Sequence, residues 1–265
     1  MSSLTDRFHQ PLPSWIEEIK GEVRDKISKA EFVALCHKGD ITVIESLARG
    51  LWPFIDEFPR IINRGCLRLC KPQLFHKFGF VKMLSLLRHS YEALAEIESD
   101  EEQHRKLWLD IGEALGLIYP SHYNQPILPV VKAWIRGVDK PSDPFTMFLR
   151  FTSIEMIAEA VSKGLLTSDN FTSVLRKRGC HWFRVHVAHH TGMTHEELAL
   201  RLAFAFHERE PVKETCNQAI QEVVDLLISA ANACCNLAAS RANSSPKHRR
   251  LSKEKPAVGE TRSLS

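Results

Sequence analysis

Apolar side chains recur every three to four residues along most of the chain, which is the pattern of amphipathic helices. The first run extends from Ser14 to about Lys29, and Ser14 is placed to cap it. A short helix is expected from Ala30 to about Cys36, ended by the turn at 38–40. No run of alternating β-branched residues occurs, so strands are not expected.

The middle of the chain carries longer apolar runs. We expect a helix over 41–70 that is kinked at Pro53 and Pro59, because each proline removes a backbone donor. Pro72 suits the first turn of the next helix, which should continue to about Glu98.

A helix start is predicted at Ser99, because Glu102 follows three residues later and completes a capping box. This helix should end near Gly116. Further helices are expected over 125–138, 143–163, 168–177, 180–208 and 212–240. Residues 1–240 are therefore predicted to form one all-α domain, a bundle of seven to eight helices, and such bundles build their sites from side chains that point inward.

The charge of the chain is unevenly distributed. Residues 241–265 contain seven Lys or Arg against two Glu, so this segment carries +5 of the total net charge of +3 and the rest carries −2. It is rich in Ser, Pro and Lys and has almost no large apolar residue, so we expect a disordered basic tail. No aromatic residues interleave its charges, which disfavours nucleic-acid binding.

The composition is that of an ordinary soluble domain: 265 residues, 44% hydrophobic and 25% charged. No apolar run approaches the roughly 20 residues that cross a bilayer, and residues 1–13 do not resemble a signal peptide. Seven cysteines without regular spacing suit a reducing compartment. We therefore expect a cytoplasmic protein without membrane contact.

Candidate chemistry is concentrated in residues 179–200, which contain five histidines. These are His181, His186, His189, His190 and His195. Histidine is the commonest neutral metal ligand, and residues four apart share a helix face, so His186 and His190 could bind one ion. A complete metal site needs further ligands, and an oxygen-activating iron site normally includes carboxylates.

Other signals of chemistry are few. Glu155 and Glu159 lie four apart in an apolar stretch and either point inward or form a rim of the bundle; the rim is the simpler expectation. No glycine-rich phosphate loop and no nucleophile elbow occur. Cys180 and His181 are neighbours, and neighbours on a helix point apart, so they do not form a nucleophile–base pair.

Three blocks of sequence, in order, resemble a known family. They are Trp52-Pro-Phe-Ile-Asp-Glu-Phe-Pro-Arg-Ile-Ile, His104-Arg-Lys-Leu-Trp-Leu-Asp-Ile-Gly-Glu-Ala-Leu-Gly-Leu and Trp182-Phe-Arg-Val-His-Val. The blocks are similar to motifs on the core helices of the haem-oxygenase-like diiron oxidases and oxygenases, which are relatives by fold of thiaminase II and pyrroloquinoline-quinone synthase. The resemblance implies a haem-oxygenase-like up-and-down helical bundle.

The ligand pattern departs from that of the family. The resemblance implies His-x-x-x-Asp/Glu-x-x-His on the last metal-bearing helix, but the corresponding residues are His186, His190 and Met193. A glutamate is expected seven residues before His104, where this chain has Ile97. Another is expected near Leu51 on the first core helix. Two of six implied ligands, His104 and His186, match without adjustment.

The resemblance implies three alternatives. The first is a non-haem iron oxidase or oxygenase that uses dioxygen to oxidise a small organic substrate in a biosynthetic pathway, with one or two iron ions. Its ligands would be chosen from His104, His186, His190, Glu96, Glu98, Glu57 and His195. The second is a pocket protein of the same fold that has lost its metal and binds a ligand or performs thiaminase-like or quinone-synthase-like chemistry. The third is a scaffold without activity. Each alternative is compatible with a homodimer.

Overall fold

The computed structural model describes residues 11–188, 193–207 and 210–244, and within these ranges it contains helices and no strand. The helices are α2 (Trp15–Ser28), α3 (Glu31–Cys36), α4 (Ile41–Arg68), α5 (Pro72–Phe78), α6 (Phe80–Ala114), α7 (Pro129–Asp139), α8 (Pro144–Leu166), α9 (Asp169–Gly179), α10 (His181–Val185), α11 (His195–Ala205) and α12 (Lys213–Ser244). The expected all-α bundle is confirmed. Helix α12 continues through residues 241–244, where the disordered tail was predicted to begin, and the rest of that predicted tail, residues 245–265, lies outside the described residues.

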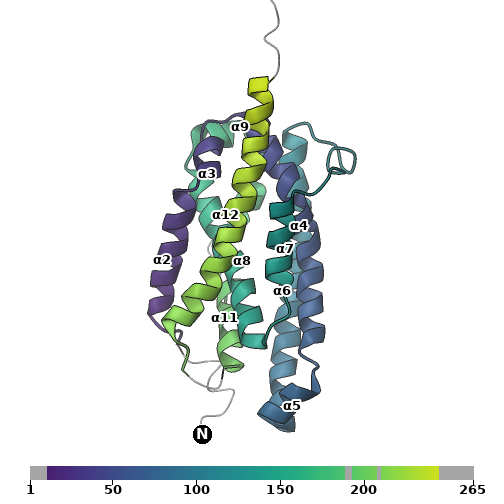
Figure 1. Cartoon of the computed structure of the whole chain (residues 1–265), viewed down its shortest axis with the longest axis vertical. Helices are drawn as coiled ribbons and strands as arrows, with labels where there is room; N and C mark the ends of the chain where they lie inside the picture. Colours follow the sequence, from purple (N-terminus) through teal and green to yellow (C-terminus); the bar gives the residue numbers. More distant parts are fainter. Residues whose placement is uncertain (1–10, 189–192, 208–209, 245–265) are drawn as a thin grey trace, which may run out of the picture.

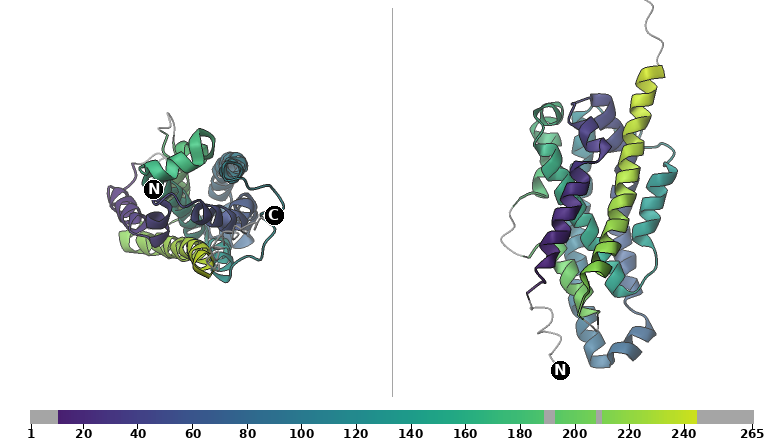
Figure 2. Two further views of the ribbon diagram at one scale, coloured as in Figure 1. Left: turned by 90° about the horizontal axis from the view of Figure 1, so that it is seen from above. Right: turned by 60° about the vertical axis from the view of Figure 1, so that its left-hand side comes forward.

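The long helices α4, α6, α8 and α12 run along the long axis of the molecule, and the short α5 lies at one end (Figure 1). The N-terminal helix α2 lies beside α12, as Figure 2 shows from a second direction. Helix α8 is central, because it packs against α2, α10, α11 and α12. The expected bundle of antiparallel helices therefore surrounds one helix that carries apolar side chains on nearly all sides.

Side-chain caps fix several helix starts. Asp40 accepts a hydrogen bond from the backbone N–H of Thr42 at 2.8 Å and so begins α4. Ser168 accepts from the Phe171 N–H and begins α9 in the same way. Ser14, in contrast, makes no capping hydrogen bond to α2, so that expectation was wrong.

Three predicted helix boundaries were also wrong. The helix predicted from Pro72 to about Glu98 is broken at Gly79, whose φ is 78°, between α5 and α6. Helix α6 runs through Ser99 without a break, because Ile97 and Trp108 are both buried on its inner face and continue one apolar stripe. Packing thus overrides the local capping signal. The helix predicted over 180–208 is instead divided, since α10 ends at Val185 and α11 begins after the cap at Thr194. Such divisions give more helices than the predicted seven or eight.

The first resembling block packs into an aromatic seam, defined here as Phe54, Phe58, Trp134 and Phe151. The Phe54 ring stacks on Trp134 of α7 with 3.6 Å between centroids and on Phe58 with 5.3 Å. Phe58 in turn meets the edge of Phe151 on α8, at 6.2 Å. Helix α4 continues through Pro53 and Pro59 on this seam. Burial of each ring stabilises the fold by about 1.5–3 kcal/mol.

Candidate functional site

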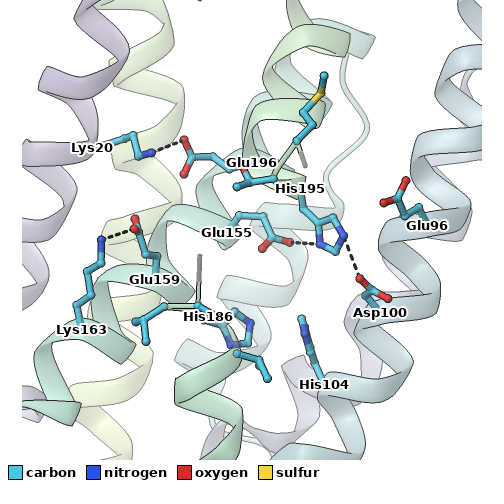
Figure 3. A pocket seen from close by; sticks show the side chains of 15 residues that line it. Lys20, Glu96, Asp100, His104, Glu155, Glu159, Lys163, His186, His195 and Glu196 are labelled. Atoms are coloured by element: carbon cyan, nitrogen blue, oxygen red, sulfur yellow. Dashed lines mark hydrogen bonds and ion pairs between the residues drawn. The ribbon is translucent and has the colours of Figure 1, made fainter. Parts of the chain in front are cut away.

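A cavity of about 460 Å³ opens between α6, α8, α10 and α11, with Lys20 of α2 at its edge. Its lining residues include five acidic and three imidazole side chains. They are Lys20, Glu96, Asp100, His104, Glu155, Glu159, Lys163, Val185, His186, Val187, Ala188, Met193, Thr194, His195 and Glu196. Figure 3 shows Glu155 and His195 pointing toward one another above His104 and His186. We call this cavity the acid–base pocket.

His186 follows the last residue of α10, and its tautomer is fixed by the backbone. Its Nδ1 lies 2.7 Å from the Trp182 carbonyl oxygen, which can only accept, so Nδ1 carries the proton. Nε2 is then left as a proton acceptor. Burial, and then the neighbouring His104, lower the pKa of His186 to about 4. The imidazole is therefore neutral at neutral pH.

His104 lies on α6 with its ring centroid 4.5 Å from that of His186. Its Nδ1 is 3.2 Å from the Glu101 carboxylate. Burial alone would lower the pKa of His104, but the hydrogen bond and charge of Glu101, together with the charge of Asp100, outweigh it and raise the pKa. Two adjacent imidazoles are thus shifted in opposite directions.

Glu155 of α8 is the acidic residue most perturbed by its surroundings. Only 13% of its side chain is exposed, and its Oε1 is buried without a hydrogen-bond partner among the described residues. Burial, and then the negative charges of Glu101, Glu196 and Asp100, raise the pKa of Glu155 well above its ordinary value. The carboxyl group therefore holds its proton at a pH where ordinary glutamates have lost theirs.

His195 begins α11 and connects two carboxyl groups across the pocket. Its Nε2 is 3.2 Å from Asp100 on α6, and its Nδ1 is 3.9 Å from the Oε1 of Glu155. The first distance is a hydrogen-bonded ion pair when His195 is protonated, whereas the second is too long for a direct hydrogen bond. His195 thus links α11 to α6 through Asp100, with the Glu155 carboxyl group of α8 nearby.

A second carboxyl group, Glu196, closes the pocket toward α2. Its Oε1 is 3.2 Å from the Lys20 ammonium. Burial raises the pKa of Glu196, while Lys20 opposes this rise. Further along α8, Glu159 is paired with Lys163. These two lysines offset part of the negative charge of the pocket.

The structure brings together four of the residues singled out as metal ligands. His104, His186, His195 and Glu96 line the pocket, although Glu96 is exposed at its rim. His190 lies outside the described residues.

The remaining two carboxylates lie elsewhere. Glu57 is paired with Arg60 and Arg64 on the outer face of α4, each at 2.9 Å, and Glu98 accepts a hydrogen bond from Asn63. Both glutamates lie near the motifs in sequence, but their positions on the helices turn their side chains away from the pocket. On α6 it is Ile97, next to Glu98, that is buried.

Glu155 was expected at the rim of the bundle rather than in its interior. The expectation of a rim position was wrong for this residue, since it points into the pocket. The available signal was the spacing of Glu155 and Glu159, four apart in a helix most of whose other residues are buried. Asp100, Glu101 and Glu196 were not among the predicted site residues.

The donor set of the described residues does not fit the six-ligand centre that the family resemblance implies. No three His, Cys, Asp or Glu side chains in the described ranges are placed to hold one metal ion. Burial raises the pKa of Glu155, the best-placed carboxyl group, and so disfavours the carboxylate form that binds a metal ion.

Comparisons with known proteins show the fold. A TenA homolog from Pseudomonas syringae pv. tomato str. DC3000 has a TM-score of 0.67 at 13% identity, covering 89% of this chain and 98% of that one. A TenA family transcription regulator from Silicibacter sp. TM1040 has a TM-score of 0.52 at 12% identity, covering 87% and 99%. No family model and no curated protein matches. The chain therefore shares the helical-bundle fold of these two structures.

The described helices include none that is long and apolar enough to cross a membrane. The expected cytoplasmic location stays a prediction.

Proposed function

We propose that the chain is an enzyme that binds a small organic molecule in the acid–base pocket and moves protons on it, without requiring a bound metal. The observation that carries the proposal is the pairing of a neutral imidazole, His186, with a protonated carboxyl group, Glu155, in one cavity. Titratable groups whose pKa values are pushed in opposite directions are the usual acid and base of an active site.

Each group has a role that follows from its surroundings. The free Nε2 of His186 accepts a proton from the ligand, because the Trp182 carbonyl holds Nδ1–H. Glu155 delivers its own proton to a second atom of the ligand, and the resulting carboxylate is stabilised by His195. His104, held by Glu101, positions the His186 ring and limits its charge. The net step is removal of a proton at one atom and addition at another.

Covalent catalysis by a thiolate is not supported at this pocket. None of its described lining residues is a cysteine. Cys180, at the start of α10, is buried, and burial raises the pKa of its thiol.

A non-haem iron oxidase or oxygenase is the second candidate. Two imidazoles and the unpartnered Oε1 of Glu155 face one cavity, and such an oxygen can accept a cation if its proton leaves. Iron would supply activation of dioxygen; His104, His186 and Glu155 would hold it only after moving closer together, because no three such side chains in the described ranges are placed to share one ion. This candidate predicts binding that depends on iron.

The test measures binding of nitrogen heterocycles, pyridine, 4-aminopyrimidine and thiamin, to protein treated with a chelator. Ring nitrogens of this kind can accept a hydrogen bond from a protonated carboxyl group. We expect at least one probe to bind and to shift the ¹H–¹³C signals of His104 and His186. Glu155→Leu should weaken binding by about tenfold or more, because the hydrogen bond is lost.

Two controls make the test specific. Glu155→Gln should bind within about threefold of the original protein, because an amide keeps a donor as a protonated carboxyl group does. Glu57→Leu, outside the pocket, should change nothing. The proposal is overturned if chelator-treated protein binds no probe, and binding only by iron-loaded protein would favour the oxidase.

A further inference from the structure

We propose that a basic groove beside the acid–base pocket binds an anionic group, most suitably a phosphate, carried by the same ligand. The groove is lined by Lys177, Arg178, His181, Arg184, Val185 and Ala188. This inference rests on the proposed function, since it assigns a chemical class to the ligand of that site.

The groove and the pocket are adjacent. Val185 and Ala188 line both cavities, so the end of α10 and the residues after it form their common wall. A ligand that places its reacting atoms near His186 therefore has a short path to the groove. Of the lining residues, neither Val185 nor Ala188 is buried, which leaves this wall accessible from both sides.

The two cavities have opposite charge. The pocket is lined by Glu96, Asp100, Glu155, Glu159 and Glu196 against two lysines. The groove, in contrast, has two lysine or arginine side chains free of carboxylate partners, and no acidic residue lines it within the described ranges. A ligand that spans both should carry its anionic group at the groove.

The cations of the groove differ in how they are engaged. Arg178 is paired with Asp110 and Glu113, so its charge is offset. Arg184 donates to the Lys177 carbonyl oxygen at 3.2 Å, which holds the guanidinium beside the end of α9. Neither Lys177 nor Arg184 forms an ion pair with any described carboxylate. These two charges are therefore available to a ligand.

The backbone places these residues on one side. Helix α9 is interrupted at Arg176, whose φ of 57° is the single positive value at a non-glycine residue in the described ranges. The interruption turns the chain so that Lys177, His181 and Arg184 line one groove across the junction of α9 and α10. Arginine with lysine and histidine suits a phosphate, because the guanidinium offers several fixed donors and the others add charge and a further donor.

The first experiment titrates the full chain with inorganic phosphate at low ionic strength and measures affinity by calorimetry. Replacing both Lys177 and Arg184 by alanine should raise the Kd by at least about tenfold. The matched control replaces Lys132 and Arg136, an exposed lysine and arginine on α7, and should leave the Kd within about twofold. Absence of phosphate binding, or equal loss in both double variants, overturns the proposal.

A second probe, pyridin-4-ylmethyl phosphate, tests whether one ligand spans both cavities. It should bind more tightly than inorganic phosphate and shift the ring signals of His186, which inorganic phosphate alone should not. Binding without a shift of His186 would contradict the span.

Glu155→Leu separates this inference from the proposed function. The variant should bind inorganic phosphate normally even if the acid–base proposal fails. Loss of phosphate binding in Glu155→Leu would place the anion in the pocket and overturn the assignment to the groove.

Discussion

The aromatic seam and the acid–base pocket of the same bundle have opposite effects on the stability of the fold. At the aromatic seam, every ring is buried against another ring, with centroids 3.6–6.2 Å apart. At the acid–base pocket, Glu155 holds a buried oxygen without a partner, and His186 is kept neutral. The seam is what a folded core requires. The pocket costs stability, and such a cost at a cavity is typical of a functional site.

The largest expected effect comes from the seam. Phe54→Ala removes a ring that is 1% exposed and stacked on Trp134. We expect a loss of about 3–5 kcal/mol in the free energy of unfolding, measured with urea. Phe54→Leu should lose distinctly less, because most of the volume remains. Equal losses for the two variants would show that the seam is not packed as described.

The second effect is a pH dependence of the free energy of unfolding, which comes from His186 in the acid–base pocket. The pKa of His186 is about 4 in the folded chain and about 6.5 when unfolded, so the unfolded chain takes up a proton at a higher pH than the folded chain does. The part of the free energy of unfolding that comes from His186 is therefore fully present above pH 6.5 and is lost as the pH falls toward 4. This loss amounts to about 3 kcal/mol. His186→Gln should lack that part of the acid sensitivity. An unchanged pH profile in the variant would contradict the neutral imidazole.

Glu155→Leu should stabilise the protein by about 1–3 kcal/mol, because it removes a buried polar group without a partner. The pKa of Glu155 is raised on folding, so the carboxyl group favours the folded state most at low pH and less as the pH rises. The gain from leucine should therefore grow with pH. Glu159→Leu, which breaks the pair with Lys163, should give no gain. A destabilised Glu155→Leu variant would mean that the carboxyl group has a partner.

The smallest effect separates the pocket from the surface carboxylates. Glu57→Gln and Glu98→Gln each remove partly exposed charges and should change the free energy of unfolding by about 1 kcal/mol or less. Neither should shift the NMR signals of His104 or His186. A shift in those signals would show that one of these glutamates reaches the pocket.

The sequence predicted the fold better than the site. Apolar periodicity located most helices, because apolar residues spaced three to four apart lie on one face of a helix, and that face is buried. It misplaced the break at Ser99, where the buried stripe through Ile97 continues and outweighs the cap.

For the site, the matching blocks identified His104 and His186. Glu57 and Glu98 were also proposed because they lie near the motifs in sequence, but their side chains pair with residues outside the pocket. The role of Glu155 depends on Glu101, Glu196 and Asp100, which come from two other helices, and only folding brings them together.

The protonation state of Glu155 tests the account most directly. Infrared difference spectra between the original protein and Glu155→Gln at pH 7 isolate the C=O stretch of a protonated carboxyl group. We predict that this band is present in the original protein, disappears in the variant and persists after treatment with a chelator. If the difference spectrum contains carboxylate bands alone, Glu155 is ionised and cannot be the acid of the pocket.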